Sequence, residues 1–193
     1  MIIGITGGTG SGKTTLLQLM AQQDVLILDC DAIYHELLNT DPSLLTAIET
    51  RFPGTVEHGQ LQRKKLGSIV FSDPSALADL NKITHHAITA ELLRRLACKP
   101  THAAIDAAAL IESGIHRLCD VTVAVNAPAA LRLQWLMDRD HISAEYAQNR
   151  MNAQPTSLWY TQHCDYTLEN NGTAAEFQAK CLAFLQELGI LKV

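Results

Sequence analysis

The sequence predicts an α/β protein built on a five-stranded, parallel, doubly wound sheet. Five short apolar runs alternate along the chain with segments of helical spacing, and a single helix separates the first two runs. Short runs of this kind are typical of strands that are buried on both faces of a parallel sheet. Strands that alternate with helices indicate βαβ connections, and 193 residues fit one domain.

The first predicted strand covers residues 2–6 and stops at two glycines, and helical spacing begins at Leu16. The second strand covers residues 25–28 and ends in the acidic sequence Asp29-Cys30-Asp31. We place the second helix from residue 32 onward, at the start of a long helical stretch.

Two start signals divide this stretch, which extends to about residue 97. Asp41-Pro42 and Asp73-Pro74 each place an N-capping acid before a proline that suits the first position of a helix. The stretch is too long for a single crossover between two strands. We therefore expect it to form a helical subdomain over the sheet.

The second half of the chain contains the other three predicted strands and three helices. The strands cover residues 103–106, 121–125 and 166–168, and the helices cover 128 to about 140, 143–154, and a C-terminal segment that starts at 173. Ser143 is a suitable N-cap for the middle helix, and Pro155 stops it. Thr173-Ala174-Ala175-Glu176 has the pattern of a capping box and predicts the start of the last helix.

Composition and charge limit the ligands that the chain can take. Hydrophobic residues make up 47% of the chain and charged residues 18%, which indicates a globular protein and not a disordered one. The formal net charge of −5 provides no basic excess, so we expect no nucleic-acid partner. An anionic ligand would need a local region of positive potential.

The five cysteines are an odd number and include no Cys-x-x-Cys pair, which argues against a disulfide framework or a four-cysteine zinc site. The N-terminal residues lack the basic segment of a signal peptide, and no uncharged apolar run approaches the roughly 20 residues of a membrane span. We therefore expect a cytoplasmic protein with reduced thiols and no membrane partner, monomeric or weakly homo-oligomeric.

The glycine-rich segment Gly7-Gly8-Thr9-Gly10-Ser11-Gly12-Lys13-Thr14 satisfies the phosphate-loop pattern G-x-x-x-x-G-K-[ST] in full. It lies between a predicted strand and a predicted helix, where backbone N–H groups and the helix dipole can bind phosphate. Lys13 would reach the β- and γ-phosphates of a nucleoside triphosphate, and the Thr14 hydroxyl would coordinate Mg²⁺. The predicted nucleotide-binding residues are Gly8, Thr9, Gly10, Ser11, Gly12, Lys13, Thr14 and Thr15.

Several other classes of phosphate-loop protein are excluded by missing motifs. No Asp has Gly three residues later, and Asn81-Lys82-Ile83-Thr84 does not complete the guanine motif of a GTPase. The signature of ATP-binding-cassette transporters is also absent. At this length the remaining class is a small-molecule kinase, which needs an acceptor site, a group that aligns the acceptor hydroxyl, and a cationic lid.

Asp29-Cys30-Asp31 provides candidates for the aligning group, because it lies at the carboxyl end of a predicted strand, where α/β sheets bind ligands. Asp31 could accept the proton of the acceptor hydroxyl. Asp29, or Asp106 at the end of another predicted strand, could hold Mg²⁺ through water. The alternative for Asp31 is a structural role as a helix N-cap, and the two roles are compatible.

Further motifs follow in order along nearly the whole chain. They are Asp29-Cys30-Asp31, His35-Glu36-Leu37, Arg63 through Phe71, Leu80 through His85, Asp106 through Glu112, Arg139-Asp140, Arg150 with Gln154, and Asp165 with Asn170-Asn171-Gly172. Together with the phosphate loop, in this combination and spacing, they resemble the dephospho-coenzyme A kinase family.

The resemblance implies a phosphate-loop kinase fold and transfer of the γ-phosphate of ATP, with Mg²⁺, to the ribose 3′-hydroxyl of dephospho-coenzyme A. It also implies three regions. These are a nucleotide-binding core at 1–31, 98–131 and 161–193, an acceptor-binding helical region at about 32–97, and a lid at about 132–160.

Roles for individual residues follow from the same resemblance. It implies that Asp31 is the catalytic base, that Arg63 and His85 bind the acceptor, and that Arg139 is a lid cation over the ATP phosphates. Two alternatives stay open: another nucleoside or nucleotide kinase, or a non-catalytic nucleotide-binding regulator.

Other candidate residues have competing structural explanations. Lys64 and Lys65 fit a solvated helix face, and His85-His86 lacks neighbours that would complete a metal site. Asp106 and Glu112 could organise Mg²⁺ or simply be structural acids. Trp135 and Trp159 flank the lid and could stack on adenine or only pack.

The sequence also departs from the family pattern. Residues 106–110 lack the usual proline, and His86 replaces another proline. Trp135 stands where an arginine is common, and Tyr160 where a lysine or arginine is common. The remaining lid cations are Arg132, Arg139 and Arg150. Arg132 shares a helix face with Trp135, and we expect it to substitute in part for the missing charge.

Overall fold

The computed structural model describes residues 1–191, so the last two positions of the expected core segment 161–193 lie outside the described residues. The elements in chain order are β1 (Ile2–Thr6), α1 (Lys13–Ala21), β2 (Leu26–Asp29), α2 (Cys30–Thr40), α3 (Pro42–Arg51), β3 (Val56–Glu57), β4 (Gln60–Leu61), α4 (Arg63–Val70), α5 (Pro74–Leu96), β5 (Ala103–Asp106), the 3₁₀ helix η1 (Ile115–Leu118), β6 (Val121–Asn126), α6 (Ala129–Asp140), α7 (Ala144–Asn152), α8 (Ser157–His163), β7 (Tyr166–Glu169) and α9 (Ala174–Glu187).

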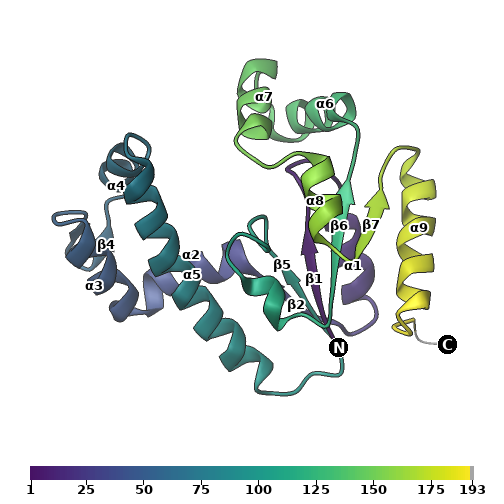
Figure 1. Ribbon diagram of the computed structural model, residues 1–193, viewed down its shortest axis with the longest axis horizontal. Helices are drawn as coiled ribbons and strands as arrows, with labels where there is room; N and C mark the ends of the chain where they lie inside the picture. Colours follow the sequence, from purple (N-terminus) through teal and green to yellow (C-terminus); the bar gives the residue numbers. More distant parts are fainter. Residues whose placement is uncertain (192–193) are drawn as a thin grey trace. The chain divides into compact units, whose positions relative to one another are not determined.

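Five of these strands form one sheet in the order β2-β5-β1-β6-β7, which confirms the predicted doubly wound fold (Figure 1). The pairings of β1 with β5, of β1 with β6 and of β6 with β7 are parallel. The chain order reverses at β1, whose two neighbours come from later in the sequence. In open α/β sheets, ligands bind at the carboxyl ends of the strands at such a switch point.

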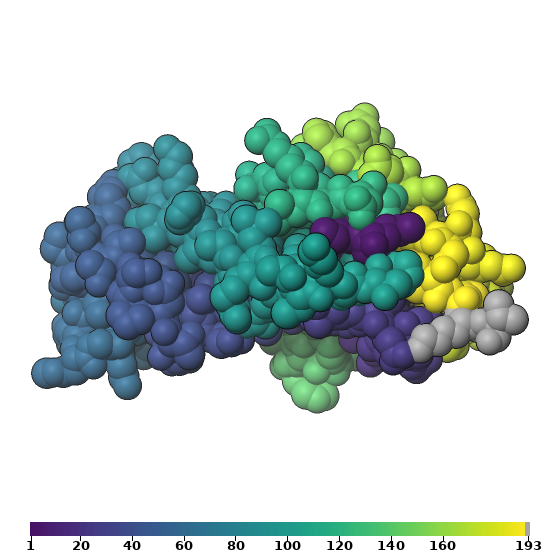
Figure 2. Space-filling model, turned by 90° about the horizontal axis from the view of Figure 1, so that it is seen from below, coloured from purple at the N-terminus to yellow at the C-terminus, as the bar shows by residue number. Residues whose placement is uncertain are grey.

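The chain divides into two compact units. The first, the sheet unit, consists of Met1–Leu28 and Pro100 onward. One of its hydrophobic clusters joins β1 and β6 to α1 and α9. It includes Ile3, Leu16 and Phe184, each at most 3% exposed. Figure 2 shows the N-terminal residues on the surface of the face seen from below, in accord with the 40% exposure of Met1. Among the described residues, no helix is both long enough and apolar enough to cross a membrane.

The second unit, the helical unit, consists of Asp29–Lys99. The 23-residue helix α5 is the longest helix of this unit, and α2, α3 and α4 all contact it (Figure 1). Arg95 of α5 forms ion pairs with Glu91 of its own helix and with Glu36 of α2. The predicted caps are confirmed at Asp41 and Asp73, whose carboxylates accept backbone N–H bonds at the starts of α3 and α5.

The alternative interpretation of Asp31, as the N-cap of α2, is wrong. Asp31 does not cap α2, because the helix begins at Cys30 and the Asp29 carboxylate accepts the N–H groups of Asp31 and Ala32 at 2.8 and 3.0 Å. Asp31 instead lies exposed in the first turn of the helix. In the same way, α1 begins at Lys13 and not at Leu16, because the phosphate loop leads directly into the helix.

Several short elements have no counterpart in the sequence prediction, among them the β3–β4 hairpin and α8. Strands β3 and β4 form a hairpin whose two-residue turn, His58-Gly59, has positive φ at both positions, as a type I′ turn requires. Two-residue strands are too short for an apolar period to be recognised. Helix α8 has only seven residues, and its N-cap Thr156 immediately follows the proline that was expected to end helical structure.

Candidate functional site

The phosphate loop lies between β1 and α1 of the sheet unit, at the switch point of the sheet. Gly12 occupies the N-cap position of α1 with φ +104°, a left-handed conformation that favours glycine. No side chain caps α1, whereas α7, α8 and α9 of the same unit each have a hydroxyl cap. The first N–H groups of α1 are therefore left for an anion, and the helix dipole adds positive potential.

The two polar residues that follow Gly12 are arranged as a phosphate site needs. The Lys13 ammonium donates to the carbonyl of Gly7 at 2.8 Å, so its side chain folds back along the loop. Thr14 is exposed in the first turn of α1, and Thr15 donates its backbone N–H to the Gly12 carbonyl. Ser11 is buried, with 1% exposure.

Three side chains from later in the chain hold the loop in place. The amide oxygen of Gln154 accepts the N–H of Thr9 at 2.7 Å, and Nε of Arg132 donates to the Thr9 carbonyl at 2.9 Å. The Asn170 amide donates to the carbonyl of Ser11 at 3.0 Å. The motif positions Gln154 and Asn170 had no assigned role, and the structure shows them as supports of the loop.

Asp106 ends β5 beside the phosphate loop. Its partner in the parallel pairing is Ile5 of β1, two residues before Gly7. The register thus places this carboxylate at the edge of the sheet where the loop begins. Asp106 and Thr14 offer only oxygen donors, the type of ligand that Mg²⁺ prefers.

The other two cations of the expected lid, Arg139 and Arg150, both pair with the carboxylate of Asp140. Arg139 donates from Nε and Nη2 to the two oxygens of Asp140 at 2.6 and 3.0 Å, and Arg150 donates to the same side chain at 2.6 Å. The hydrogen bonds from Arg139 and then Arg150 hold the pKa of Asp140 well below its usual range. The Arg139 side chain is 58% exposed. Within the described part of the chain it forms hydrogen bonds with Asp140 and not with the phosphate loop.

The aromatic residues near the lid pack against protein groups. Trp159 stacks on His163 with ring centroids 4.3 Å apart and meets Tyr160 edge-on at 5.3 Å. Tyr160 is 1% exposed, and burial raises the pKa of its hydroxyl to about 12, with a smaller contribution from exposed Glu112. Trp135 is half-buried. Tyr160 therefore provides no positive charge at this position.

In the helical unit, a cavity of about 220 Å³ brings two of the predicted acceptor residues together. Asp31 lines it from α2 and His85 lines it from α5. The other lining residues are Tyr34, Leu80, Asn81, Thr84 and Ile88.

A neighbouring cavity of about 190 Å³ contains the third predicted acceptor residue, Arg63. It shares Tyr34 and Leu80 with the first cavity and is otherwise mostly apolar. Nη2 of Arg63 lies 3.2 Å from Nδ1 of His35, which accepts the hydrogen bond. Burial raises the pKa of the Tyr34 hydroxyl, and the positive charge of Arg63 opposes this effect. Tyr34 therefore lies between the three predicted acceptor residues, Asp31, Arg63 and His85. It carries no charge, so no sequence pattern singled it out.

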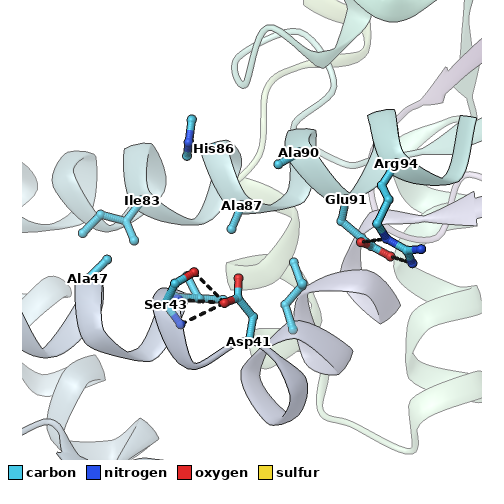
Figure 3. Close-up of a pocket in the computed structure, with 11 residues that line it drawn as sticks. Asp41, Ser43, Ala47, Ile83, His86, Ala87, Ala90, Glu91 and Arg94 are labelled. Atoms are coloured by element: carbon cyan, nitrogen blue, oxygen red, sulfur yellow. Dashed lines mark hydrogen bonds and ion pairs between the residues drawn. The ribbon is translucent and has the colours of Figure 1, made fainter. Parts of the chain in front are cut away.

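The two basic residues that follow Arg63 in the chain, Lys64 and Lys65, are exposed, and Lys65 lies 3.5 Å from Glu57. A larger cavity of about 310 Å³ lies between α5 and the α2–α3 segment (Figure 3). Its acidic groups are already paired, Asp41 with Ser43 and Glu91 with Arg94. It contains none of the predicted site residues.

An open parallel sheet with a phosphate loop at its switch point, followed by the Lys and Thr that open α1, defines a phosphate-loop protein of the small-molecule kinase class. Solved structures agree with this fold. Shikimate kinase from Acinetobacter baumannii superimposes with a TM-score of 0.55 over 97% of this chain and 92% of that one, at 18% identity.

Comparisons with known sequences identify the family. The family model for dephospho-CoA kinase matches residues 1–176. The dephospho-CoA kinase of Deinococcus radiodurans is 33% identical over 192 residues, which cover 97% of this chain and 92% of the relative. The dephospho-CoA kinase of Latilactobacillus sakei is 31% identical and covers 95% and 94%. The chain therefore belongs to the dephospho-CoA kinase family.

Two solved structures resemble the whole chain more closely. The structure of TT1252 from Thermus thermophilus has a TM-score of 0.83 at 30% identity and covers 97% of both chains. Dephospho-CoA kinase from Campylobacter jejuni has a TM-score of 0.70 at 24% identity and covers 97% of this chain and 96% of that one.

Proposed function

We propose that this protein transfers the γ-phosphate of ATP to the ribose 3′-hydroxyl of dephospho-coenzyme A, giving coenzyme A and ADP. The observation that carries the proposal is the family match over residues 1–176, which includes an intact phosphate loop. In the reaction, the acceptor oxygen forms a bond to the γ-phosphorus, the bond from that phosphorus to the β,γ-bridging oxygen breaks, and the acceptor hydroxyl loses its proton.

The sheet unit binds ATP. Residues Gly8 through Thr15 surround the phosphates and donate those backbone N–H groups that are not already bonded within the protein. The Lys13 ammonium neutralises charge on the β- and γ-phosphates. Thr14 would hold Mg²⁺, with Asp106 or Asp29 acting through water. When bound, Mg²⁺ neutralises the charge that develops on the transferred and leaving oxygens.

The helical unit binds the acceptor. The cavity that contains Asp31 and His85 takes the ribose, and Arg63 in the adjoining cavity binds an anionic group of dephospho-CoA. Asp31 accepts the proton of the 3′-hydroxyl. Its carboxylate is exposed in this cavity and is spared a capping role, since Asp29 caps the helix.

Segment 132–160 is the lid, and Arg139 is a cation that can approach the phosphates once it leaves Asp140. Its side chain is 58% exposed, so its rearrangement displaces little packing. We also place the enzyme in the cytoplasm as a monomer or weak homo-oligomer. Cys98, Cys119, Cys164 and Cys181 are free thiols, which supports a reducing compartment.

A panel of acceptors tests the proposal. The protein is incubated with ATP and Mg²⁺ and with dephospho-CoA, adenosine, AMP or CMP, and formation of ADP and of the phosphorylated acceptor is measured. We expect rapid transfer to dephospho-CoA alone. Preferred transfer to a nucleoside or nucleotide would replace this function by the rival kinase, and ATP binding without transfer to any acceptor would favour a regulator.

A further inference from the structure

Arg132 is a buried cation beside the phosphate loop. It lies on α6 with only 6% of its surface exposed. Its Nε donates to the carbonyl of Thr9, but its Nη2 is buried with no hydrogen-bond partner among residues 1–191. In the described part of the chain, no carboxylate forms an ion pair with it, whereas Arg139 and Arg150 both pair with Asp140.

Gly8 shows how closely the guanidinium approaches the loop. A Cβ atom at Gly8 would clash with Nη2 and would lie 2.5 Å from Cζ and 2.8 Å from Nη1 of Arg132. The φ of Gly8 is not in the positive region that Gly7, Gly10 and Gly12 occupy. A side chain at position 8 would have to displace the Arg132 guanidinium, which occupies that space.

A buried arginine in this state is unfavourable without a partner. Burial lowers the pKa of Arg132, which shows that its charge is poorly solvated. Removing a charge from water is unfavourable unless an opposite charge or good hydrogen bonds compensate. The nearest element of the fold that binds anions is the phosphate loop, which the guanidinium already contacts.

Two residues of the expected lid, Trp135 and Tyr160, also bear on the charge of Arg132. Trp135 lies one turn further along the same helix, and it is uncharged. Buried Tyr160 lies close enough to feel the charge of Arg132, which opposes the rise in the tyrosine pKa. Arg132 thus shares a helix with Trp135 and interacts electrostatically with Tyr160.

We infer that Arg132 provides the fixed positive charge of this phosphate loop, and that the β- and γ-phosphates of the bound nucleotide are its counter-ion. Nε positions the Gly8–Thr9 segment of the loop, and the fork of Nη groups provides charge and a free N–H donor for phosphate. This inference rests on the proposed function only in that the loop binds a nucleoside polyphosphate.

Binding measurements test the inference separately from phosphate transfer. The affinities of ADP and adenosine are measured by calorimetry for the wild type, Arg132→Gln and Arg132→Lys. Gln retains an N–H donor for the Thr9 carbonyl but loses the charge, and Lys retains the charge but loses the fork. Arg117→Gln is the matched control, because Arg117 is an exposed arginine of the same unit, on η1.

If the inference is right, Arg132→Gln weakens ADP binding by roughly 10-fold to 100-fold, as for loss of a hydrogen bond to a charged group. Arg132→Lys recovers part of the affinity, Arg117→Gln has no effect, and adenosine binds all variants alike. The melting temperature of nucleotide-free Arg132→Gln stays equal to or above that of the wild type, because an unpaired buried charge has been removed.

Two results would overturn the inference. One is unchanged ADP affinity in Arg132→Gln, which would mean that Arg132 only donates a hydrogen bond to the Thr9 carbonyl and that its charge does not bind phosphate. The other is equal loss of ADP and adenosine binding together with a lower melting temperature of the nucleotide-free variant, which would make Arg132 a structural residue. Failure to phosphorylate dephospho-CoA would contradict the proposed function and leave the ADP measurements valid.

Discussion

The two acidic residues at the start of α2 have different tasks. Asp29 accepts two backbone N–H groups, and this leaves Asp31, one residue into the helix, exposed in a cavity with His85. A carboxylate that caps a helix cannot easily rotate toward a substrate, because the helix would lose its cap. The structure therefore favours Asp31 over Asp29 as the group that accepts the acceptor proton.

Replacing Asp31 with Asn tests this assignment. We expect turnover with dephospho-CoA to fall by about 10²- to 10⁴-fold, the range typical of a general base, because the amide cannot accept the proton. The dissociation constant for ATP should stay close to that of the wild type. Asp79→Asn removes an exposed carboxylate of the same unit that lines neither acceptor cavity and serves as the control. A normal rate in Asp31→Asn would exclude the catalytic role.

At this scale the sequence predicted the residues whose roles follow from local pattern. The eight contiguous positions Gly7–Thr14 specify a strand, a turn and a helix start together, so the loop could be located directly. Gln154 and Asn170 could not be placed in the same way. Their partners, Thr9 and Ser11, lie 145 and 159 residues away in the chain, and only the tertiary fold brings them together.

At the scale of elements, hydrogen bonds from connecting segments fix how strands meet. Asp165, just before β7, accepts from the N–H and the hydroxyl of Thr122 in β6 at 2.8 and 2.7 Å. Its own N–H donates to the same hydroxyl at 3.0 Å. These bonds set the register in which Val123 faces Tyr166, and so position Asn170 after β7 to reach the phosphate loop.

The Asp165 contacts predict a pH dependence of stability. The hydrogen bond from the Thr122 hydroxyl, together with that from its N–H, lowers the pKa of Asp165 below its unfolded value of about 3.9. A carboxyl with a lowered folded pKa stabilises the protein above its unfolded pKa, and this contribution disappears as the pH falls through the folded pKa.

Asp165→Ala should therefore lower the melting temperature at pH 7, and its difference from the wild type should shrink as the pH is brought to about 3. Thermal unfolding of both proteins across this range measures the effect. Asp138→Ala, on the exposed side of α6, is the control and should show no such trend. A difference that stays constant with pH would mean that the charge of Asp165 contributes nothing to stability.

The elements themselves were predicted well where period and caps agree. All five strands of the sheet were located to within a residue at either end, and the capping box at Thr173 and Glu176 is present at the start of α9. The β3–β4 hairpin and α8 were missed because each is shorter than the window in which an apolar period can be read. Their place in the fold depends on contacts and not on local pattern.

At the scale of the whole molecule, an acidic chain must bind polyanionic substrates. The net charge of −5 gives no long-range attraction for ATP, so the binding charge has to be local. In our proposal, the sheet unit provides this charge at the N-terminus of α1, at Lys13 and at Arg132, and the helical unit provides it at Arg63. Each compact unit thus has its own cationic group for the phosphates that it binds.

The most direct test of the central claim is the initial rate of phosphate transfer from ATP with Mg²⁺ to dephospho-CoA and to its 3′-deoxyribose analogue. The account predicts one molecule of coenzyme A for each ADP formed with dephospho-CoA. It also predicts no transfer to the analogue, because the accepting hydroxyl is missing. Equal ADP formation with both compounds, or no transfer to dephospho-CoA by protein that binds ATP, would contradict it.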